Sequence, residues 1–387
     1  MGEKPAGGLL PPATAPSPSA DEAALLLGQL TDPDLHFPEH PVFVDDVACF
    51  EMPDGLGFQF RGGEAPVLVR GRLARPALDY LREALDGTRG VFDIVRGAPA
   101  SVPATAVARM LLVLHSKGVI ARPDPSPAAS GLDHRERLFW GRHLAITRSA
   151  DSASEILARS ARARIAVLGD GLFAAVVADL LSRSGFTNQE VVGTPLDGAS
   201  GGQDDPHANG AQDDRRLGEL EHALEGADLL VTATVDASRA FLLGINDTIM
   251  RAHLPWLMAN WDGSTVEIGP LVHPGETACY ECATLRRAST DPLAIEDALY
   301  HEELAARGRT LSGEALWPAT LVAGLLVAEV ARCVTGVAPE TLANSVIRMQ
   351  PVSGVLVQGD VQRVPRCPGC YAGAIPPREL TDPDGAG

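Results

Sequence analysis

Two Cys-x-x-Cys pairs, far apart along the chain, constrain what this sequence can fold into more than any other feature. The first pair is Cys279 and Cys282, and the second is Cys367 and Cys370. Cysteines with this spacing can supply four thiolates to one tetrahedral zinc ion, and a closed shell of four thiolates is a structural site. Such a site would fasten the C-terminal part of the chain to the segment around the first pair. The alternative interpretation is two separate redox dithiols, or two pairs with no common role.

Charge and hydropathy exclude several classes of partner. The formal net charge is −18, and a field of that sign repels phosphate backbones and anionic lipid, so we expect neither nucleic acid nor a membrane surface as a partner. The most apolar stretch, residues 316–334, is interrupted by Pro318 and two charged residues, and the N-terminus has no signal-peptide pattern. We therefore expect a cytoplasmic protein, in which cysteines are metal ligands or thiols before they are disulfides. Cys49 and Cys333 lie in apolar surroundings and are expected to be buried core residues.

The length of 387 residues allows two or three domains. Residues 1–38 and 373–387 are expected to be flexible tails. Residues 40–122 are expected to form a small winged-helix-type module, in which three strands precede three helices. Its strands are predicted at residues 42–52, 57–61 and 66–70, and its helices at residues 76–85, 88–96 and 101–117. Residues 123–160 are expected to be a linker and a connecting helix.

From residue 161 the pattern changes to buried-type strands that alternate with helices. This predicts an α/β fold with a doubly wound, Rossmann-like sheet over residues 161–372. Strands are predicted at residues 165–168, 190–193 and 228–233, helices at 172–184 and 217–224, and a mobile loop at 194–216. Gly169 and Gly171 follow the first strand as half of a dinucleotide-binding fingerprint. Taken alone this signal is weak, because a tight turn needs its glycines whether or not a nucleotide binds.

Residues 269–282, which end in the first cysteine pair, resemble the segment that precedes the first zinc cysteines of ThiF-type proteins. Trp317-Pro318-Ala319 and the stretch that follows resemble the late helix of the same family, with Glu329 in its acidic position and Gly336 closing it. Two further segments, residues 244–247 and 255–260, also fit. Together these motifs give residues 160–372 a resemblance to the ThiF and ubiquitin-activating-enzyme family.

The chain departs from the adenylating members of that family at several positions. Those members have a glycine pair in the first loop, where this chain has Gly171-Leu172, and acidic residues that hold ribose after the second strand, where residues 191–195 run into a Gly/Asp-rich loop. The family's magnesium-binding aspartate falls on Val235 or, with a shift of one residue, on Asp236. There is also no cysteine between 282 and 333 to accept a carrier protein. Phosphate transfer needs cationic clamps and a metal ligand in register, so we expect no ATP cofactor and no catalytic residue.

Residues 40–122 resemble the PqqD-like recognition element of enzymes that modify ribosomal peptides. The features in common are the Gly87-Thr88 junction before the second helix and the apolar third helix, which ends in Gly118-Val119-Ile120. Such modules bind a precursor's leader peptide as an added strand, with main-chain hydrogen bonds for affinity and side-chain pockets for register. The resemblance implies a peptide-binding surface formed by Val67, Leu68, Val69, Arg70, Arg109, Leu112 and His115. The alternative is that Arg70, Arg109 and His115 are ordinary solvated residues.

The order and length of the two parts resemble the ThiF-like partner proteins of thiazole/oxazole-modified peptide and thiopeptide pathways. This resemblance implies a leader-peptide-binding scaffold, not catalytic alone, that presents the core of a precursor to a YcaO-type cyclodehydratase. It also admits a homodimer. The main alternative is an ATP-dependent adenylating enzyme that acts on the C-terminus of a peptide or carrier protein. A redox Rossmann protein ranks last, because nothing after the second strand would hold a ribose.

Overall fold

The computed structural model describes residues 37–44, 47–62, 65–123, 134–147, 149–150, 152–193, 208–307 and 313–371. The chain divides into two compact units, residues 1–155 and residues 156–387. The predicted tails lie almost entirely outside the described residues, as does most of the predicted loop at 194–216.

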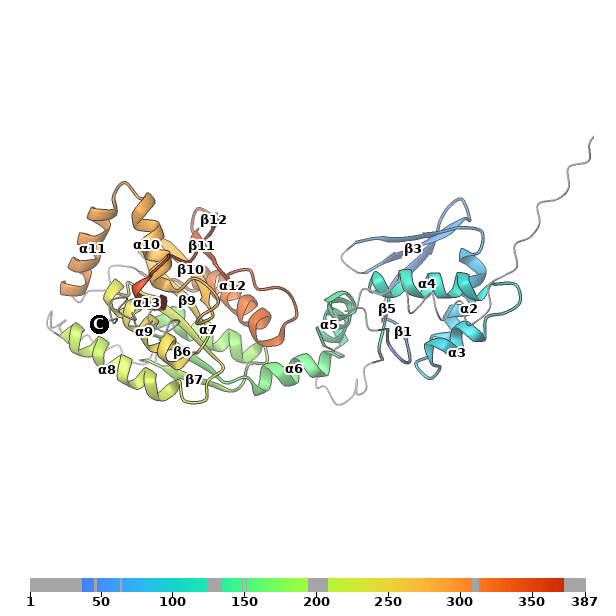
Figure 1. Ribbon diagram of the computed structural model, residues 1–387, viewed down its shortest axis with the longest axis horizontal. Helices are drawn as coiled ribbons and strands as arrows, with labels where there is room; N and C mark the ends of the chain where they lie inside the picture. The colour runs from blue at the N-terminus through green and yellow to red at the C-terminus, as the bar shows by residue number, and fades with distance from the viewer. Residues whose placement is uncertain are drawn as a thin grey trace, which may run out of the picture. The chain divides into compact units, whose positions relative to one another are not determined.

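The first unit is built on a three-stranded antiparallel sheet with the strand order β2-β3-β4 (Figure 1). Its strands are β2 (Ala48–Glu51), β3 (Gly57–Arg61) and β4 (Val67–Arg70). Helices α2 (Ala74–Ala84), α3 (Val91–Arg96) and α4 (Ala104–Ser116) follow in the predicted order. Phe58 and Phe60 of β3 pack into one core cluster with the buried faces of these helices. Because β4 is the last strand of this sheet, one of its edges is open among the described residues.

Two boundaries of the first unit differ from the prediction. The single strand predicted at 42–52 is wrong: β1 (Val42–Phe43) pairs with β5 (Ile120–Ala121), whereas β2 pairs with β3. The sequence between β1 and β2 contains two successive aspartates, a residue type that strands disfavour. Helix α3 begins at Val91 instead of near Thr88, because the Thr88 amide and hydroxyl both donate to Asp86 Oδ1, at 2.8 and 2.7 Å, in the preceding turn.

The second unit contains a seven-stranded mixed sheet with the strand order β12-β11-β10-β9-β8-β6-β7. The parallel strands are β6 (Ile165–Gly169), β7 (Gln189–Val192), β8 (Leu229–Val235) and β9 (Trp256–Asp262). The antiparallel strands are β10 (Thr265–Val272), β11 (Ser345–Gln350) and β12 (Val355–Asp360). The prediction of a parallel sheet therefore holds for one half, and the three antiparallel strands extend it on one side.

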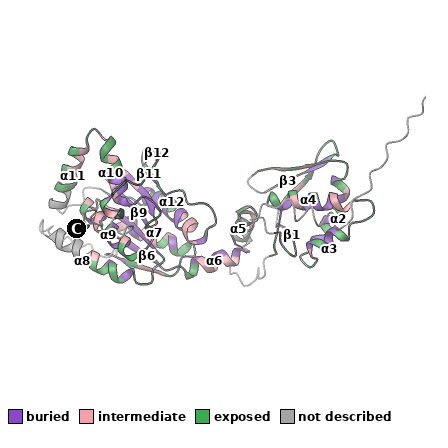
Figure 2. Ribbon diagram, viewed as in Figure 1, coloured by how far each residue is buried: buried purple, intermediate pink, exposed green. Residues whose placement is uncertain are grey.

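Helices cover both faces of this sheet, and each face has its own core. Successive residues of β6 alternate between the two: Ile165 and Val167 belong to one cluster, and Ala166 and Leu168 to the other. Helices α7 (Gly171–Arg183) and α12 (Leu316–Thr335) pack on the first face. The second face carries α8 (Ala208–Ala223), α9 (Arg239–Ala252), α10 (Tyr280–Thr290) and α13 (Pro368–Tyr371). Figure 2 shows the buried residues concentrated along the sheet and the inner faces of these helices.

The remaining helices complete the units. Helix α5 (His134–Thr147) belongs to the first unit, and α11 (Ala294–Arg307) follows α10 in the second. Helix α6 (Ala153–Arg162) crosses the division between the units. The second unit begins at Ile156, five residues before residue 161, where we predicted the start of the α/β domain. Its residue Ile156 is fully buried and its Arg159 donates to the carbonyl of Thr335 at 2.7 Å, so this helix is anchored to the second unit. Helix α8 begins at Ala208 instead of 217, because Ala, Gln and Arg residues extend it into the predicted loop.

Helix α12 is an apolar core helix. Its length and composition alone would allow it to cross a membrane. However, half of its most apolar 18-residue segment is buried inside the protein. Pro318 is tolerated because it lies in the first turn, and Gly336, with φ +67°, ends the helix in the left-handed conformation. Glu329 is fully buried on this helix, and its carboxylate accepts hydrogen bonds of 2.7 Å from Arg332, from the Thr341 amide and hydroxyl, and from the Leu342 amide. The carboxylate thus ties α12 to the segment that leads into β11.

We expect Glu329→Gln to lower the free energy of unfolding by about 2–4 kcal/mol, because it leaves buried amides and Arg332 without their charged acceptor. The exposed Glu296 of α11 offers a matched control, and Glu296→Gln should change stability by less than about 0.5 kcal/mol. Urea-induced unfolding, followed by circular dichroism, measures both values. Equal stability of the two variants would contradict the structural role given to Glu329.

Candidate functional site

The four predicted metal-binding cysteines lie together in the second unit. The Sγ atom of Cys279 is 3.8 Å from that of Cys282 and 3.7 Å from that of Cys367, and the Sγ atoms of Cys282 and Cys370 are 3.6 Å apart. All four sulfurs lie within 4.8 Å of one another, and each residue is at most 3% exposed. Zn–S bonds of about 2.3 Å place the sulfurs of a tetrahedral site about 3.8 Å apart. The observed spacing therefore fits a metal ion at the centre of the cluster.

Local structure positions both pairs. Cys279 is the N-cap residue of α10, so Cys282 lies on the first turn of that helix. Cys370 lies in the short helix α13, and Cys367 directly precedes that helix. The buried Asn246 of α9 accepts the Tyr280 amide at 3.1 Å and thereby fixes the start of α10. A Cβ at Gly369, between the second pair, would lie 2.6 Å from a carboxylate oxygen of Glu281 and 2.7 Å from the amide nitrogen of Asn246, so both side chains would have to shift.

The sulfurs share their protons unequally. The hydrogen bond between Cys279 and Cys282 lowers the pKa of the Cys282 thiol to about 4 and raises that of Cys279, which burial raises further. Burial raises the pKa of Cys367 to about 12. The Val364 amide, 3.3 Å from the Cys282 sulfur, adds a hydrogen bond to the charged form. One thiolate is thus favoured in the cluster, and a dication would stabilise the others.

The remaining cysteines were predicted to be buried core residues, and both are in fact half-buried. Burial raises the pKa of Cys49, and burial together with Glu340 raises that of Cys333 to about 12. Both are therefore protonated thiols near neutral pH and poor nucleophiles.

The glycines of the predicted nucleotide loop have structural reasons to be glycine. Gly169 ends β6 so close to β8 that a Cβ would collide with the carbonyl oxygen of Ala233, and Gly171 starts α7 with φ +71°. Val235 ends β8, and Asp236, the other candidate for the magnesium position, adopts φ +50° with its amide bonded to Trp261. These conformations explain the residues without a nucleotide.

A carboxylate of the chain itself lies against the start of α7. Glu314 accepts hydrogen bonds from the amides of Leu172 and Phe173 at 3.1 and 2.7 Å. In nucleotide-binding α/β folds, the amides at this helix N-terminus receive a phosphate group. Asp170, just before the helix, pairs with Arg216 at 2.5 Å. The amides of Leu172 and Phe173 and the carboxylate of Asp170 therefore all have partners within the chain.

The predicted peptide-binding residues lie partly at the surface and partly in the core of the first unit. Along β4, Val67 and Val69 pack against the core, whereas Leu68 and Arg70 are exposed. On α4, Arg109 is exposed and Leu112 is half-buried. His115 is only 4% exposed, with its Nδ1 3.4 Å from the carbonyl of Ile120 and its ring 4.5 Å from that of Phe37. In this conformation His115 supports the core and is not accessible to a peptide.

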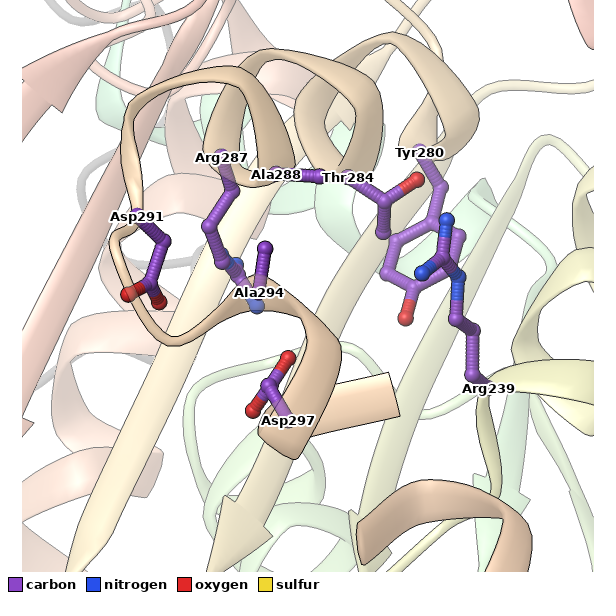
Figure 3. Close-up of a pocket in the computed structure, with 8 residues that line it drawn as sticks. All are labelled: Arg239, Tyr280, Thr284, Arg287, Ala288, Asp291, Ala294 and Asp297. Carbon is purple, nitrogen blue, oxygen red and sulfur yellow. The ribbon is translucent and has the colours of Figure 1, made fainter. Parts of the chain in front are cut away.

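A polar pocket in the second unit lies where α10 meets α11, beside the start of α9 (Figure 3). It is lined by Arg239, Tyr280, Thr284, Arg287, Ala288, Asp291, Ala294 and Asp297. Arg287 pairs with Glu267 of β10. Because both signs of charge line this pocket, it favours neither a phosphate nor a cation.

The sequence did not predict the role of Glu314, which belongs to no motif and to no apolar repeat. Asn246 lies in the segment 244–247 that fits the ThiF resemblance, but its contact with the Tyr280 amide, 34 residues away, was not predicted. The signal for Asn246 was a polar residue in the middle of an otherwise apolar helix face, with Leu242 and Ile249 around it.

We expect protein purified without chelators to carry about one divalent metal ion per chain, and Cys367→Ser to lose it together with stability of the second unit. The reason is that ion binding and folding are coupled when a buried site has four thiolates. Cys49→Ser, a change in the first unit, is the control and should keep the ion. Metal analysis by mass spectrometry gives the stoichiometry, and finding no metal in the unaltered protein would contradict the assignment.

We expect Glu314→Ala to lower the stability of the protein by about 1 kcal/mol, because it removes the acceptor at the start of α7. The freed amides should then bind inorganic phosphate, so phosphate should raise the melting temperature of the variant more than that of the unaltered protein. Exposed Glu276 supplies the control variant, Glu276→Ala. Equal phosphate shifts in all three proteins would show that the amides offer no anion site.

No protein-family model and no curated protein matches this sequence. Solved structures match it in fold. A heterocyclase in complex with substrate and cofactor aligns with a TM-score of 0.54 and 18% identity, over 85% of this chain and 39% of that chain. The heterocyclase TruD aligns with a TM-score of 0.52 and 20% identity, over 86% of this chain and 43% of its own. The chain thus spans well under half the length of these two heterocyclases.

Escherichia coli MccB, solved with ATP, aligns with a TM-score of 0.57 and 14% identity, over 85% of this chain and 99% of its own. At such identities the likeness concerns the fold. The mixed α/β architecture of this chain is therefore similar to that of the heterocyclase and MccB structures.

Proposed function

We propose that this chain is a leader-peptide-binding scaffold of ribosomal peptide modification. Residues 40–122 bind the leader of a precursor peptide, and the chain presents the core to a YcaO-type cyclodehydratase that forms thiazoline or oxazoline rings. The observation that carries the proposal is the open edge of β4 with Leu68 exposed, in a unit separate from the ThiF-like sheet. The fold that the chain shares with a heterocyclase bound to its substrate supports it.

The geometry of β4 suits strand addition. Among the described residues, β4 pairs with β3 and has no strand on its other side. An edge of this kind offers unpaired main-chain groups to an extended peptide. Alternate side chains of such a peptide would lie toward the core face, where Val67 and Val69 are partly buried, and toward the outer face beside Leu68, which is 53% exposed. Val113 lies on α4, the helix that the resemblance assigns to leader binding, and is 40% exposed.

The occupied nucleotide loop supports a scaffold over an adenylating enzyme. ATP could reach the start of α7 only after Glu314 leaves the amides of Leu172 and Phe173. The alternative remains the adenylating activity named above, and the likeness to MccB solved with ATP favours it. Titration calorimetry with ATP and Mg²⁺ separates the two, because the scaffold should give no binding heat and the adenylating enzyme should bind.

We further propose that the four-cysteine cluster holds a structural zinc ion. Four thiolates in a closed, buried shell select zinc among the common cellular dications. A scaffold of this kind works in the cytoplasm, where these thiols stay reduced until the metal binds. A homodimer would present two leader-binding units, and the mass of the protein in solution tests this.

The leader proposal predicts unequal effects of two similar substitutions on opposite edges of one sheet. Leu68 of β4 and Phe50 of β2 are 53% and 55% exposed, so replacing either should leave the fold intact. We expect Leu68→Asp to weaken binding of the leader about tenfold or more, because it puts a charge in the added strand's contact surface, and Phe50→Asp to change it by less than about twofold.

Fluorescence anisotropy with a labelled synthetic leader, taken from the precursor encoded beside the gene, measures the two dissociation constants. A larger effect of Phe50→Asp would move the peptide to the β2 edge. Unchanged binding in both variants would remove the recognition site from this sheet.

A further inference from the structure

Three further side chains with metal-binding groups lie close together in the second unit, on the opposite side of the large sheet from the four-cysteine cluster. His273 directly follows β10, Cys333 lies near the end of α12, and Glu340 lies between α12 and β11. Their ligand atoms lie within 4.8 Å of one another, and His273 Nε2 is 2.9 Å from Glu340 Oε2. Cys333 packs against the core on the α7 and α12 side, whereas the four clustered cysteines belong to the opposite core. The two groups are therefore distinct.

The backbone holds each of the three residues independently. The His273 amide donates to the Thr277 hydroxyl at 2.7 Å, and its carbonyl accepts the amides of Glu276 and Thr277. Cys333 is fixed by the packing of α12. Glu340 directly precedes Thr341, whose amide is held by the buried carboxylate of Glu329. A group of ligands on three separately anchored segments is preorganised, so little entropy is lost when an ion brings them together.

The chemistry of the three groups suits a transition-metal dication. Imidazole, thiolate and carboxylate are the three protein ligands of zinc, and the two anionic ones together neutralise its charge. Bonds of about 2.0 Å to nitrogen and oxygen separate two tetrahedral ligand atoms by about 3.3 Å. The observed 2.9 Å between His273 and Glu340 would have to open by only about 0.4 Å.

We propose that His273 Nε2, Cys333 Sγ and the Glu340 carboxylate form a second metal site, for a divalent ion of the zinc class. Coordination displaces the thiol proton to solvent, and water occupies the fourth position. The side chains of His273 and Glu340 are 23% and 24% exposed, so this site opens to solvent, unlike the closed cysteine cluster. A bound ion would join the end of β10, α12 and the segment before β11.

Zinc and cobalt binding to the full-length protein test the proposal. After equilibration with zinc and removal of the excess, we expect about two zinc ions per chain in the unaltered protein and in the control Cys49→Ser. Cys333→Ala and Glu340→Gln should each hold about one. Glu340→Gln keeps the size of the side chain and one acceptor oxygen. If this variant binds less zinc but melts at the same temperature as the unaltered protein before zinc is added, the loss of metal is not a folding defect.

Cobalt provides an independent readout. Protein that carries one zinc ion in the cysteine cluster should take up one Co²⁺ with a thiolate-to-cobalt absorption band, and Cys333→Ala should abolish that band. One zinc per chain in the unaltered protein, or two in both variants, would overturn the proposal. Neither result affects the leader-binding proposal, because that rests on the first unit.

Discussion

The four-sulfur cluster is the interaction on which the second unit depends most, because it joins segments that strand pairing leaves separate. After β12, the chain crosses back to α10, where Arg286 donates to the carbonyls of Gln362 and Arg363. The second cysteine pair then enters the core beside α9 and α10. Thiols are weak donors and acceptors, so four of them in a dry core contribute little by hydrogen bonding alone. An ion that replaces their protons converts the same contacts into a major contribution to folding.

Two glutamates of this unit each accept hydrogen bonds from main-chain amides, at two different places and with different consequences. Glu329 supplies an acceptor to buried amides before β11, which stabilises the connection between a helix and the sheet. Glu314 supplies one to the amides at the start of α7. In a nucleotide-binding protein those amides are left to water until a phosphate arrives, and that exchange drives binding. In this chain a phosphate would have to displace the Glu314 carboxylate. Because that carboxylate belongs to the same chain, its effective concentration at these amides is high. The strand, turn and helix β6–α7 are kept as in nucleotide-binding α/β folds, while the amides of Leu172 and Phe173 are bonded from within the chain.

Much of this could be predicted from local signals, and the misses have three different causes. The cysteine spacing, the glycine turn after β6 and the parallel strands all have signatures within a few residues. Glu314 has none, since its partners lie about 140 residues earlier and no periodicity marks it. His115 was assigned to the surface although it follows Leu111 by one helical turn, and that spacing places it on the buried face. The antiparallel strands β10 to β12 were not predicted. Residues 269–272 were recognised only as part of the ThiF-like motif, because Gly269-Pro270 interrupts the alternation within β10.

Charge is distributed unevenly along the chain. Residues 40–122 carry ten Lys and Arg and nine Asp and Glu, so this module is nearly neutral although the whole chain has a net charge of −18. The excess negative charge therefore lies elsewhere in the chain. The main-chain pairing that the proposed leader binding requires at the β4 edge would therefore meet little net charge within its own module. Arg70 and Arg109, both exposed, add positive side chains to this module, and Arg70 is paired with Asp54 at 3.7 Å.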